Sequence, residues 1–300
     1  MPASKRFLHP DAIARISRLD LRARWIVEGF LSGQHRSPYF GQSVEFVQHR
    51  AYVPGDDLRH LDWKIWAKQD RFYIKQYEEE TNLRCTLLVD LSESMLYGQP
   101  PWTKREYACT AAVSLAYLLL RQQDAVGCIS FDDEVRYRAP QRSARSHLSA
   151  IIQTLATGEP RGKTDISGIL TAAGEASPQR GLIVLISDLL ADRASLLNGL
   201  RALRQRGHEV LVFHVLDPDE LTFPFSGPTR FEDLEGPSHV TCNPRALRDG
   251  YLAALQTFLD EVRRGCAAAA CDYVLSPTNG PLDALLAAYL HRRQIGQTRG

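Results

Sequence analysis

The sequence predicts an α/β protein with a doubly wound, mostly parallel sheet. From residue 82 onward, strand-like apolar runs alternate with helix-like runs, and such alternation is typical of this fold class. The chain has 300 residues, of which 44% are hydrophobic and 24% are charged, so it can bury a large core. We therefore expect one large domain preceded by a smaller N-terminal segment.

The N-terminal segment, residues 1–81, divides into a helix and a β-rich part. Apolar residues recur at helical spacing from Asp11 to Leu31, and Gly33 ends that pattern. Between Ser37 and Glu80, aromatic and β-branched residues surround a Pro54-Gly55-Asp56-Asp57 turn. This composition predicts short strands joined by loops.

The large domain, residues 82–300, contains the alternating elements. Four apolar runs predict strands at Cys85–Val89, Ala125–Phe131, Leu182–Ile186 and Val210–Val215. The runs between and after them predict helices at Lys104–Arg121, Ser143–Leu155, Ile166–Ala176 and Arg193–Arg206. A Pro/Gly-rich connection follows from Asp217 to Asn243. The remaining expected elements are a long helix from Pro244 to about Arg264, a strand at Tyr273–Leu275 and a helix at Leu282–His291.

Charge and hydropathy narrow the function classes. The formal net charge is +1, which provides no strong field for nucleic acid or an anionic membrane. No stretch approaches the roughly 18 consecutive apolar residues of a membrane-spanning helix, and the N-terminus lacks the apolar core of a secretory signal. The six cysteines form no C-x-x-C pair. We therefore expect a cytoplasmic protein with reduced thiols, no membrane span and no nucleic-acid partner.

The chemistry of the chain concentrates at the ends of predicted strands. Asp90, Ser92 and Ser94 come directly after the first strand, and Asp188 follows the third. Because parallel strands deliver their carboxyl ends to one edge, we expect these side chains to meet there, with Thr164 from a loop that opens a helix. Such an all-oxygen set suits Mg²⁺, or Mn²⁺ or Ca²⁺, far better than zinc. A structural alternative is that Asp90 and the two serines only cap a turn or helix.

This constellation resembles the metal-ion-dependent adhesion site of von Willebrand A-type domains. In that family an Asp-x-Ser-x-Ser motif, a loop Thr and a strand-end Asp surround one divalent ion, and all five positions match. The resemblance implies that the ion binds a partner's carboxylate and breaks no bond. The physics agrees, because a shell rich in neutral hydroxyls leaves charge on the ion for an incoming acidic side chain.

The segment from Gly41 to Glu80 carries a second signature. Its most informative members are Arg50, Gly55, Asp56, Asp57, Arg59, Asp62 and Trp63. Placed before a von Willebrand A-like domain, they resemble the domain-of-unknown-function 58 family, whose members are often encoded beside MoxR-type AAA+ ATPases. The charged members are interpreted either as a partly buried ion network or as a partner surface. The resemblance implies an adaptor or chaperone-like partner of such an ATPase or its client.

The sequence gives less support to an enzyme than to a binding module. The Gly158–Thr164 stretch has three residues between its glycines where a phosphate-binding loop needs four, and no G-x-S-x-G elbow is present. An aspartyl phosphatase needs a second Asp at the position of Ser92. We therefore expect a non-enzymatic protein-interaction module. The alternative from another class is a Mg²⁺-dependent phosphoester hydrolase that uses Asp90 or Asp188 as a base.

Overall fold

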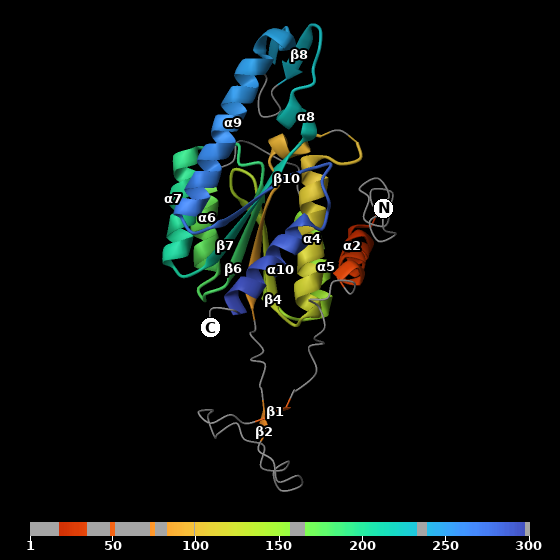
Figure 1. Cartoon of the computed structure of the whole chain (residues 1–300), viewed down its shortest axis with the longest axis vertical. Coiled ribbons are helices and arrows are strands. Elements are labelled where there is room, and N and C mark those ends of the chain that lie inside the picture. The colour runs from red at the N-terminus through yellow and green to blue at the C-terminus, as the bar shows by residue number, and fades with distance from the viewer. Residues whose placement is uncertain are drawn as a thin grey trace. The chain divides into compact units, whose positions relative to one another are not determined.

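The computed structural model describes residues 18–34, 49–51, 73–75, 83–98, 100–156, 166–232 and 239–297 (Figure 1). The chain divides into two compact units. The larger comprises Met1–Ser32 together with Leu83–Gly300, and the smaller comprises Gly33–Asn82. Helix α2 (Leu19–Gln34) therefore lies mostly in the larger unit, whereas the sequence pattern groups it with the segment 1–81.

The smaller unit contains a pair of described strands. β1 (His49–Ala51) pairs antiparallel with β2 (Tyr73–Lys75), and Arg50 lies opposite Ile74. These are short strands of the kind expected between Ser37 and Glu80. The other signature residues lie outside the described residues: Gly55, Asp56, Asp57, Arg59, Asp62 and Trp63. Their role in an ion network or a partner surface stays a prediction.

A six-stranded sheet forms the centre of the larger unit, in the order β10-β7-β6-β3-β4-β5. All neighbours pair in parallel except β5, which runs antiparallel to β4 at one edge. The strands are β3 (Arg84–Asp90), β4 (Ala125–Phe131), β5 (Val135–Arg142), β6 (Leu182–Ser187), β7 (Glu209–Leu216) and β10 (Asp272–Pro277). This mostly parallel sheet confirms the predicted von Willebrand A-like fold class.

Helices cover both faces of this sheet, so a hydrophobic core forms on each side (Figure 1). Leu87 of β3 faces α2, α4, α5 and α10, whereas the next residue, Leu88, faces α6, α7 and α9, because side chains alternate along a strand. The helices are α4 (Lys104–Arg121), α5 (Leu148–Ala156), α6 (Ile166–Ala176), α7 (Arg193–Gln205), α9 (Pro244–Ala268) and α10 (Ala284–Gln297). Among the described residues, none of these or the other helices is long and apolar enough to cross a membrane.

Four elements lie where the sequence predicts only connections: β5, α8 (Pro218–Thr222), β8 (Thr229–Glu232) and β9 (His239–Cys242). β5 is an edge strand with many exposed polar residues, which hides its pattern. The Pro/Gly-rich segment after β7 contains α8 and a hairpin of β8 with β9. In Figure 1, α8 and β8 lie with the N-terminal end of α9 beyond the carboxyl edge of the sheet. Helix α8, strand β8 and the start of α9 therefore lie beside the predicted site (Figure 1).

Candidate functional site

The candidate site lies at the carboxyl edge of the sheet, where the neighbouring parallel strands β3 and β6 end. Asp90 is the last residue of β3, and Asp188 follows the last residue of β6. Both residues are buried, with exposed fractions of 0% and 1%. The structure thus brings two of the sequence-predicted ligands to one edge, as the convergence of parallel strands requires.

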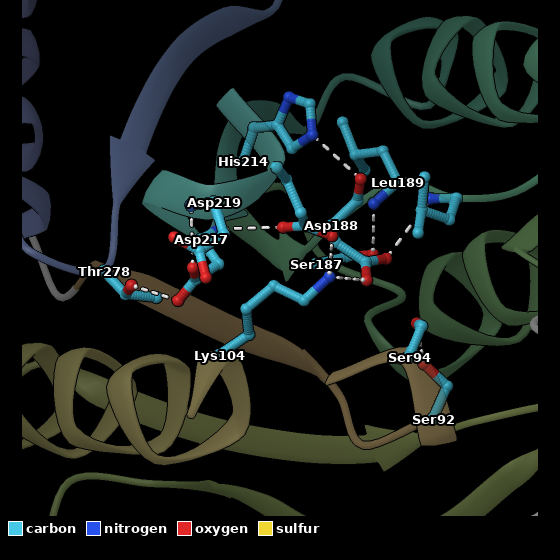
Figure 2. Close-up of polar contacts among 12 residues, drawn as sticks. Ser92, Ser94, Lys104, Ser187, Asp188, Leu189, His214, Asp217, Asp219 and Thr278 are labelled. Carbon is cyan, nitrogen blue, oxygen red and sulfur yellow. Dashed lines mark hydrogen bonds and ion pairs between the residues drawn. The ribbon is translucent and has the colours of Figure 1, made fainter. Parts of the chain in front are cut away.

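Both oxygens of the Asp90 carboxylate accept hydrogen bonds from neighbouring groups. The Ser92 amide donates to Oδ1 at 2.9 Å, and the Ser187 hydroxyl donates to Oδ2 at 2.6 Å. The Leu189 amide in turn donates to Ser187 Oγ at 2.9 Å (Figure 2). The bond to Ser92 is the turn-capping contact that the sequence left open. Each carboxylate oxygen has two lone pairs, so these contacts leave acceptor capacity for a cation.

Ser92 and Ser94 place two hydroxyls side by side (Figure 2). Ser92 precedes the short 3-10 helix η3 (Glu93–Leu96), and its Oγ lies 3.1 Å from Oγ of Ser94. In an octahedral Mg²⁺ shell with bonds of about 2.1 Å, adjacent ligand oxygens are about 3 Å apart. The hydroxyl pair therefore has the spacing of two adjacent ligands of one cation.

Lys104 is a buried cation at this edge that the sequence pattern did not reveal. Its Nζ donates to Asp188 Oδ2 at 2.8 Å (Figure 2). It also donates to Glu220 Oε1 at 2.7 Å, and Lys104 is 0% exposed. Burial lowers the pKa of Lys104, but the charges of Asp188 and Glu220 outweigh that effect, so the pKa is raised. The ammonium therefore stays charged and holds Asp188 in place.

Helix α8 positions Glu220 against Lys104. The Asp219 amide donates to Asp217 Oδ1 at 2.9 Å, and the Asp217 amide donates to Glu220 Oε2 at 2.7 Å, which forms a capping box. The Thr278 hydroxyl also donates to Asp217 Oδ2 at 3.0 Å (Figure 2). Because Thr278 directly follows β10, this bond ties the short helix to the sheet.

His214 of β7 supports the backbone at Asp188. Its Nε2 lies 2.8 Å from the Asp188 carbonyl oxygen, and its Nδ1 lies 2.8 Å from the Tyr273 hydroxyl. A carbonyl can only accept, so Nε2 donates and Nδ1 accepts from the phenol. Burial lowers the pKa of His214 to about 4, which keeps the ring neutral in this pair of bonds at neutral pH.

The electrostatics of the edge are dominated by carboxylates. Asp188 and Glu220 share one ammonium, that of Lys104, and Asp90 lies close enough to Asp188 for the two carboxylates to repel each other. Burial and, secondly, the charge of Asp188 raise the pKa of Asp90 to about 7, against the hydrogen bonds from Ser187 and Ser92. Burial also raises the pKa of Glu220, although Lys104 opposes it. A further cation beside Asp90 would relieve this repulsion.

Thr164, the fifth expected ligand, lies outside the described residues. Within the described part of the chain, no group of three or more His, Cys, Asp or Glu side chains gathers as a metal centre. A cation at this edge must therefore take much of its coordination from hydroxyls and water. Mg²⁺ accepts such ligands readily, whereas zinc prefers nitrogen and sulfur.

Solved structures with a similar fold include several proteins with low sequence identity. BatB from Bacteroides thetaiotaomicron is 21% identical with a TM-score of 0.48, over 72% of this chain and 99% of that chain. An aerotolerance-related membrane protein from Bacteroides fragilis is 20% identical with a TM-score of 0.47, over 68% of this chain and 96% of that chain. The SpRpn10 VWA domain is 15% identical with a TM-score of 0.41, over 68% and 93% of the two chains.

Sequence relatives extend over most of the chain. "Uncharacterized protein Rv1480" from Mycobacterium tuberculosis and "Uncharacterized protein Mb1516" from Mycobacterium bovis are each 31% identical over 268 residues. Each alignment covers 86% of this chain and 83% of the relative. The family model "Protein of unknown function DUF58" matches residues 48–258, which include the described strand β1 and the ends of β3 and β6. The chain therefore belongs to the DUF58 family, with a von Willebrand A-like domain.

Proposed function

We propose that this protein is a non-enzymatic interaction module that binds an acidic side chain of a partner protein through Mg²⁺. Asp90, Ser92, Ser94 and Asp188 would hold the ion, together with Thr164. The observation that carries the proposal is the pair of serine hydroxyls, 3.1 Å apart, beside the buried Asp90 carboxylate. When bound, the ion supplies a positive coordination position that a partner's carboxylate completes.

The charges at the carboxyl edge make partner binding dependent on the cation. Without it, an acidic side chain approaches Asp90 and Asp188, which are both buried. The counter-charge that the described residues provide here, Lys104, is shared between Asp188 and Glu220. Like charges at this range repel strongly in a poorly solvated site. A divalent ion reverses the sign of the local field and so turns repulsion into attraction.

The contacts around the site support binding over hydrolysis. The nearby imidazole, His214, uses both ring nitrogens, one for the Asp188 carbonyl and one for the Tyr273 hydroxyl. The Leu189 amide donates to the Ser187 hydroxyl, and the Ser187 hydroxyl donates to Asp90. Asp90 is therefore the acceptor at the end of this short chain of hydrogen bonds. These groups hold the strand ends in place, and none of them forms a nucleophile and base pair of the kind that phosphoester hydrolysis requires.

The resemblance to the DUF58 family supports a MoxR-type AAA+ ATPase, or a client of one, as the partner. The protein then acts as an adaptor or chaperone-like factor, and its ion site binds an acidic residue of the ATPase or of the client. The signature residues between Gly41 and Glu80 provide either the scaffold of this adaptor or a second contact with the partner.

Direct measurement of ion binding tests the proposed site. Mg²⁺ should raise the melting temperature of the full-length protein in metal-free buffer, because a ligand that binds only the folded state stabilises it. At a concentration of about 100 times the dissociation constant, the gain is about 2.7 kcal/mol. Ser92→Ala combined with Ser94→Ala should abolish this gain, as should Asp90→Asn. Differential scanning calorimetry with and without Mg²⁺ measures the effect.

Ser130→Ala is the matched control, because Ser130 is a buried serine on β4 whose hydroxyl has no hydrogen-bond partner among the described residues. This variant should keep the full response to Mg²⁺. Capture of a purified MoxR-type ATPase by the same four proteins, in Mg²⁺ and in chelator, then tests the partner. An equal melting shift in the wild type and in the double serine variant would contradict the ion site.

A further inference from the structure

A pocket of about 360 Å³ opens directly beside the candidate ion site. Ser94 and Lys104 of the site belong to its lining, so the two features share a wall. The rest of the lining comes from α8, the hairpin strand β8, helix α9 and the loop after Asp188. The pocket therefore lies on the same edge of the sheet where the proposed partner binds.

One wall of the pocket is an aromatic cluster centred on Phe223. Its ring stacks on Tyr251 of α9 at 4.5 Å and on Phe231 of β8 at 5.7 Å, measured between centroids. Phe225 meets Phe223 and Phe231 edge-on, at 5.2 Å each. Phe223 follows α8 in a left-handed conformation, with φ of +46°, which is unusual for a bulky residue. This backbone turn places an aromatic ring where the chain leaves the helix.

Acidic side chains line the same pocket: Asp219, Glu220 and Glu232. Glu220 already contacts Lys104, and Glu232 contacts Arg230 at 3.1 Å. Within the described ranges, no lysine or arginine forms an ion pair with Asp219. The pocket thus combines an apolar aromatic wall with a carboxylate that has no cationic partner among these residues.

Exposed apolar residues connect the pocket with the ion site. Leu190, two residues after Asp188, is 52% exposed and lines the pocket. Leu96, two residues after Ser94, is 43% exposed. Protein interfaces typically have large apolar and aromatic side chains in their buried centre and polar groups toward the rim. A single partner surface can therefore cover the ion site and the pocket together.

We propose that this pocket binds an arginine side chain of the partner whose acidic residue binds the ion. The planar guanidinium stacks on aromatic rings and pairs with a carboxylate, and the apolar stem of the side chain fills the rest of the pocket. Arginine fits better than lysine because the guanidinium is less strongly hydrated and stacks on its flat face. That the arginine belongs to the ion-binding partner rests on the proposed function. Binding of an arginine side chain in the pocket does not itself require the ion.

Small capped amino acids test this pocket on the full-length protein. The probes are Nα-acetyl-arginine methylamide, its uncharged isostere Nα-acetyl-citrulline methylamide, and the corresponding lysine and leucine compounds. Binding is followed by chemical-shift changes in the tyrosine ring signals during NMR titration. We expect the arginine probe to bind about fivefold or more tightly than each of the other three, since cation–π and charge-assisted contacts add to the apolar contact.

Two variants assign the effect to the pocket. Asp219→Asn should abolish the preference for arginine over citrulline, while Glu175→Gln, which changes an exposed acid on α6, should leave it intact. The titrations are performed in chelator and in Mg²⁺, and the preference should be the same in both. A protein that fails to bind Mg²⁺ but keeps this preference refutes the ion site alone.

The proposal is overturned by any of three results. Equal binding of the citrulline or leucine probe would show that the pocket does not distinguish a charged side chain from an uncharged one. Equal or tighter binding of the lysine probe would show that it does not select the guanidinium. An unchanged preference in Asp219→Asn would place the binding elsewhere on the molecule.

Discussion

At the scale of single residues, Lys104 determines how the candidate site is charged. Its ammonium is buried between Asp188 and Glu220, so it links the end of β6 to helix α8. Asp90, in contrast, accepts hydrogen bonds from the uncharged donors Ser92 and Ser187 in the described part of the chain. Asp188 and Glu220 therefore share one internal counter-charge, whereas Asp90 has no cation among its described hydrogen-bond donors.

Lys104→Met should lower the free energy of unfolding by about 3–5 kcal/mol, because it leaves two carboxylates without their buried counter-charge. Urea denaturation at pH 7 measures this loss. Combining it with Glu220→Gln and Asp188→Asn should recover part of the stability, since neutral amides no longer repel each other there. A loss below about 1 kcal/mol in the single variant would contradict this account of the ion pair.

The pH dependence of stability should report the environment of Asp90. Its folded-state pKa is about 7, whereas a carboxyl group in an unfolded chain has a pKa of about 4. The folded state therefore holds this proton more tightly, and the stabilisation is present below pH 4 and lost as the pH rises to 7. Relative to Asp90→Asn, the wild type in chelator should lose up to about 4 kcal/mol across that window.

Urea denaturation of both proteins between pH 4 and pH 7.5 measures this difference. The asparagine variant is the control because its side chain does not titrate, while other groups titrate alike in the two proteins. Parallel stability curves would show that Asp90 ionises freely in the folded state.

At the scale of elements, close helix packing depends on small residues at the contact. Gly199 of α7 faces Leu170 of α6, and a Cβ added at Gly199 would lie 2.6 Å from Leu170 Cδ1 and 3.0 Å from its Cβ. The Cβ of Leu170 moves only with its backbone, so rotation of the side chain cannot remove the clash. Gly199 therefore sets the distance between the two helices.

Gly199→Ala should destabilise the protein by about 1–2 kcal/mol, because the steric cost exceeds the gain in helix propensity. Gly250→Ala is the matched control, since Gly250 lies in α9 with no atom within 4 Å of an added Cβ. That change should stabilise the protein by about 0.5–1 kcal/mol. Thermal unfolding compares the two, and a stabilising Gly199→Ala would contradict the packing between α6 and α7.

Elements with a continuous apolar pattern were predictable from the sequence, and those without one were not. Helices α4 and α6 and strand β4 begin and end at the predicted residues, because each has a continuous apolar pattern. Strand β5 has eight residues, but exposed polar side chains on the sheet edge hide its alternation, and α8 has only five residues, so neither shows a detectable apolar pattern. Neither element could therefore be found from a local periodicity in the sequence.

At the scale of the whole molecule, α2 packs into the core of a domain that begins about 50 residues later in the chain. Its residues Ile26, Val27 and Phe30 belong to the same hydrophobic cluster as β3 and α4. Arg22 also lies over the Trp102 ring, 4.9 Å from its centroid. The sequence shows that α2 is amphipathic, but only the fold shows which surface it covers.

Ile26→Ala should lower the free energy of unfolding by about 2–4 kcal/mol and shift the main unfolding transition, because Ile26 is 0% exposed in the shared core. Leu21→Ala on the same helix is the control, since Leu21 is 37% exposed and should cost less than about 1 kcal/mol. Circular dichroism during denaturation measures both. A separate early transition in Ile26→Ala would show that α2 unfolds independently of the sheet.

The sequence by itself determined the fold class and the presence of Asp90, Ser92, Ser94 and Asp188 at strand ends, because strands and their ends follow from local apolar runs. Tertiary structure decided what surrounds them. Lys104 meets Asp188 and Glu220 across 84 and 116 residues of chain, and the aromatic pocket assembles from α8, β8 and α9. Such pairings depend on how distant segments pack, and no local pattern records them.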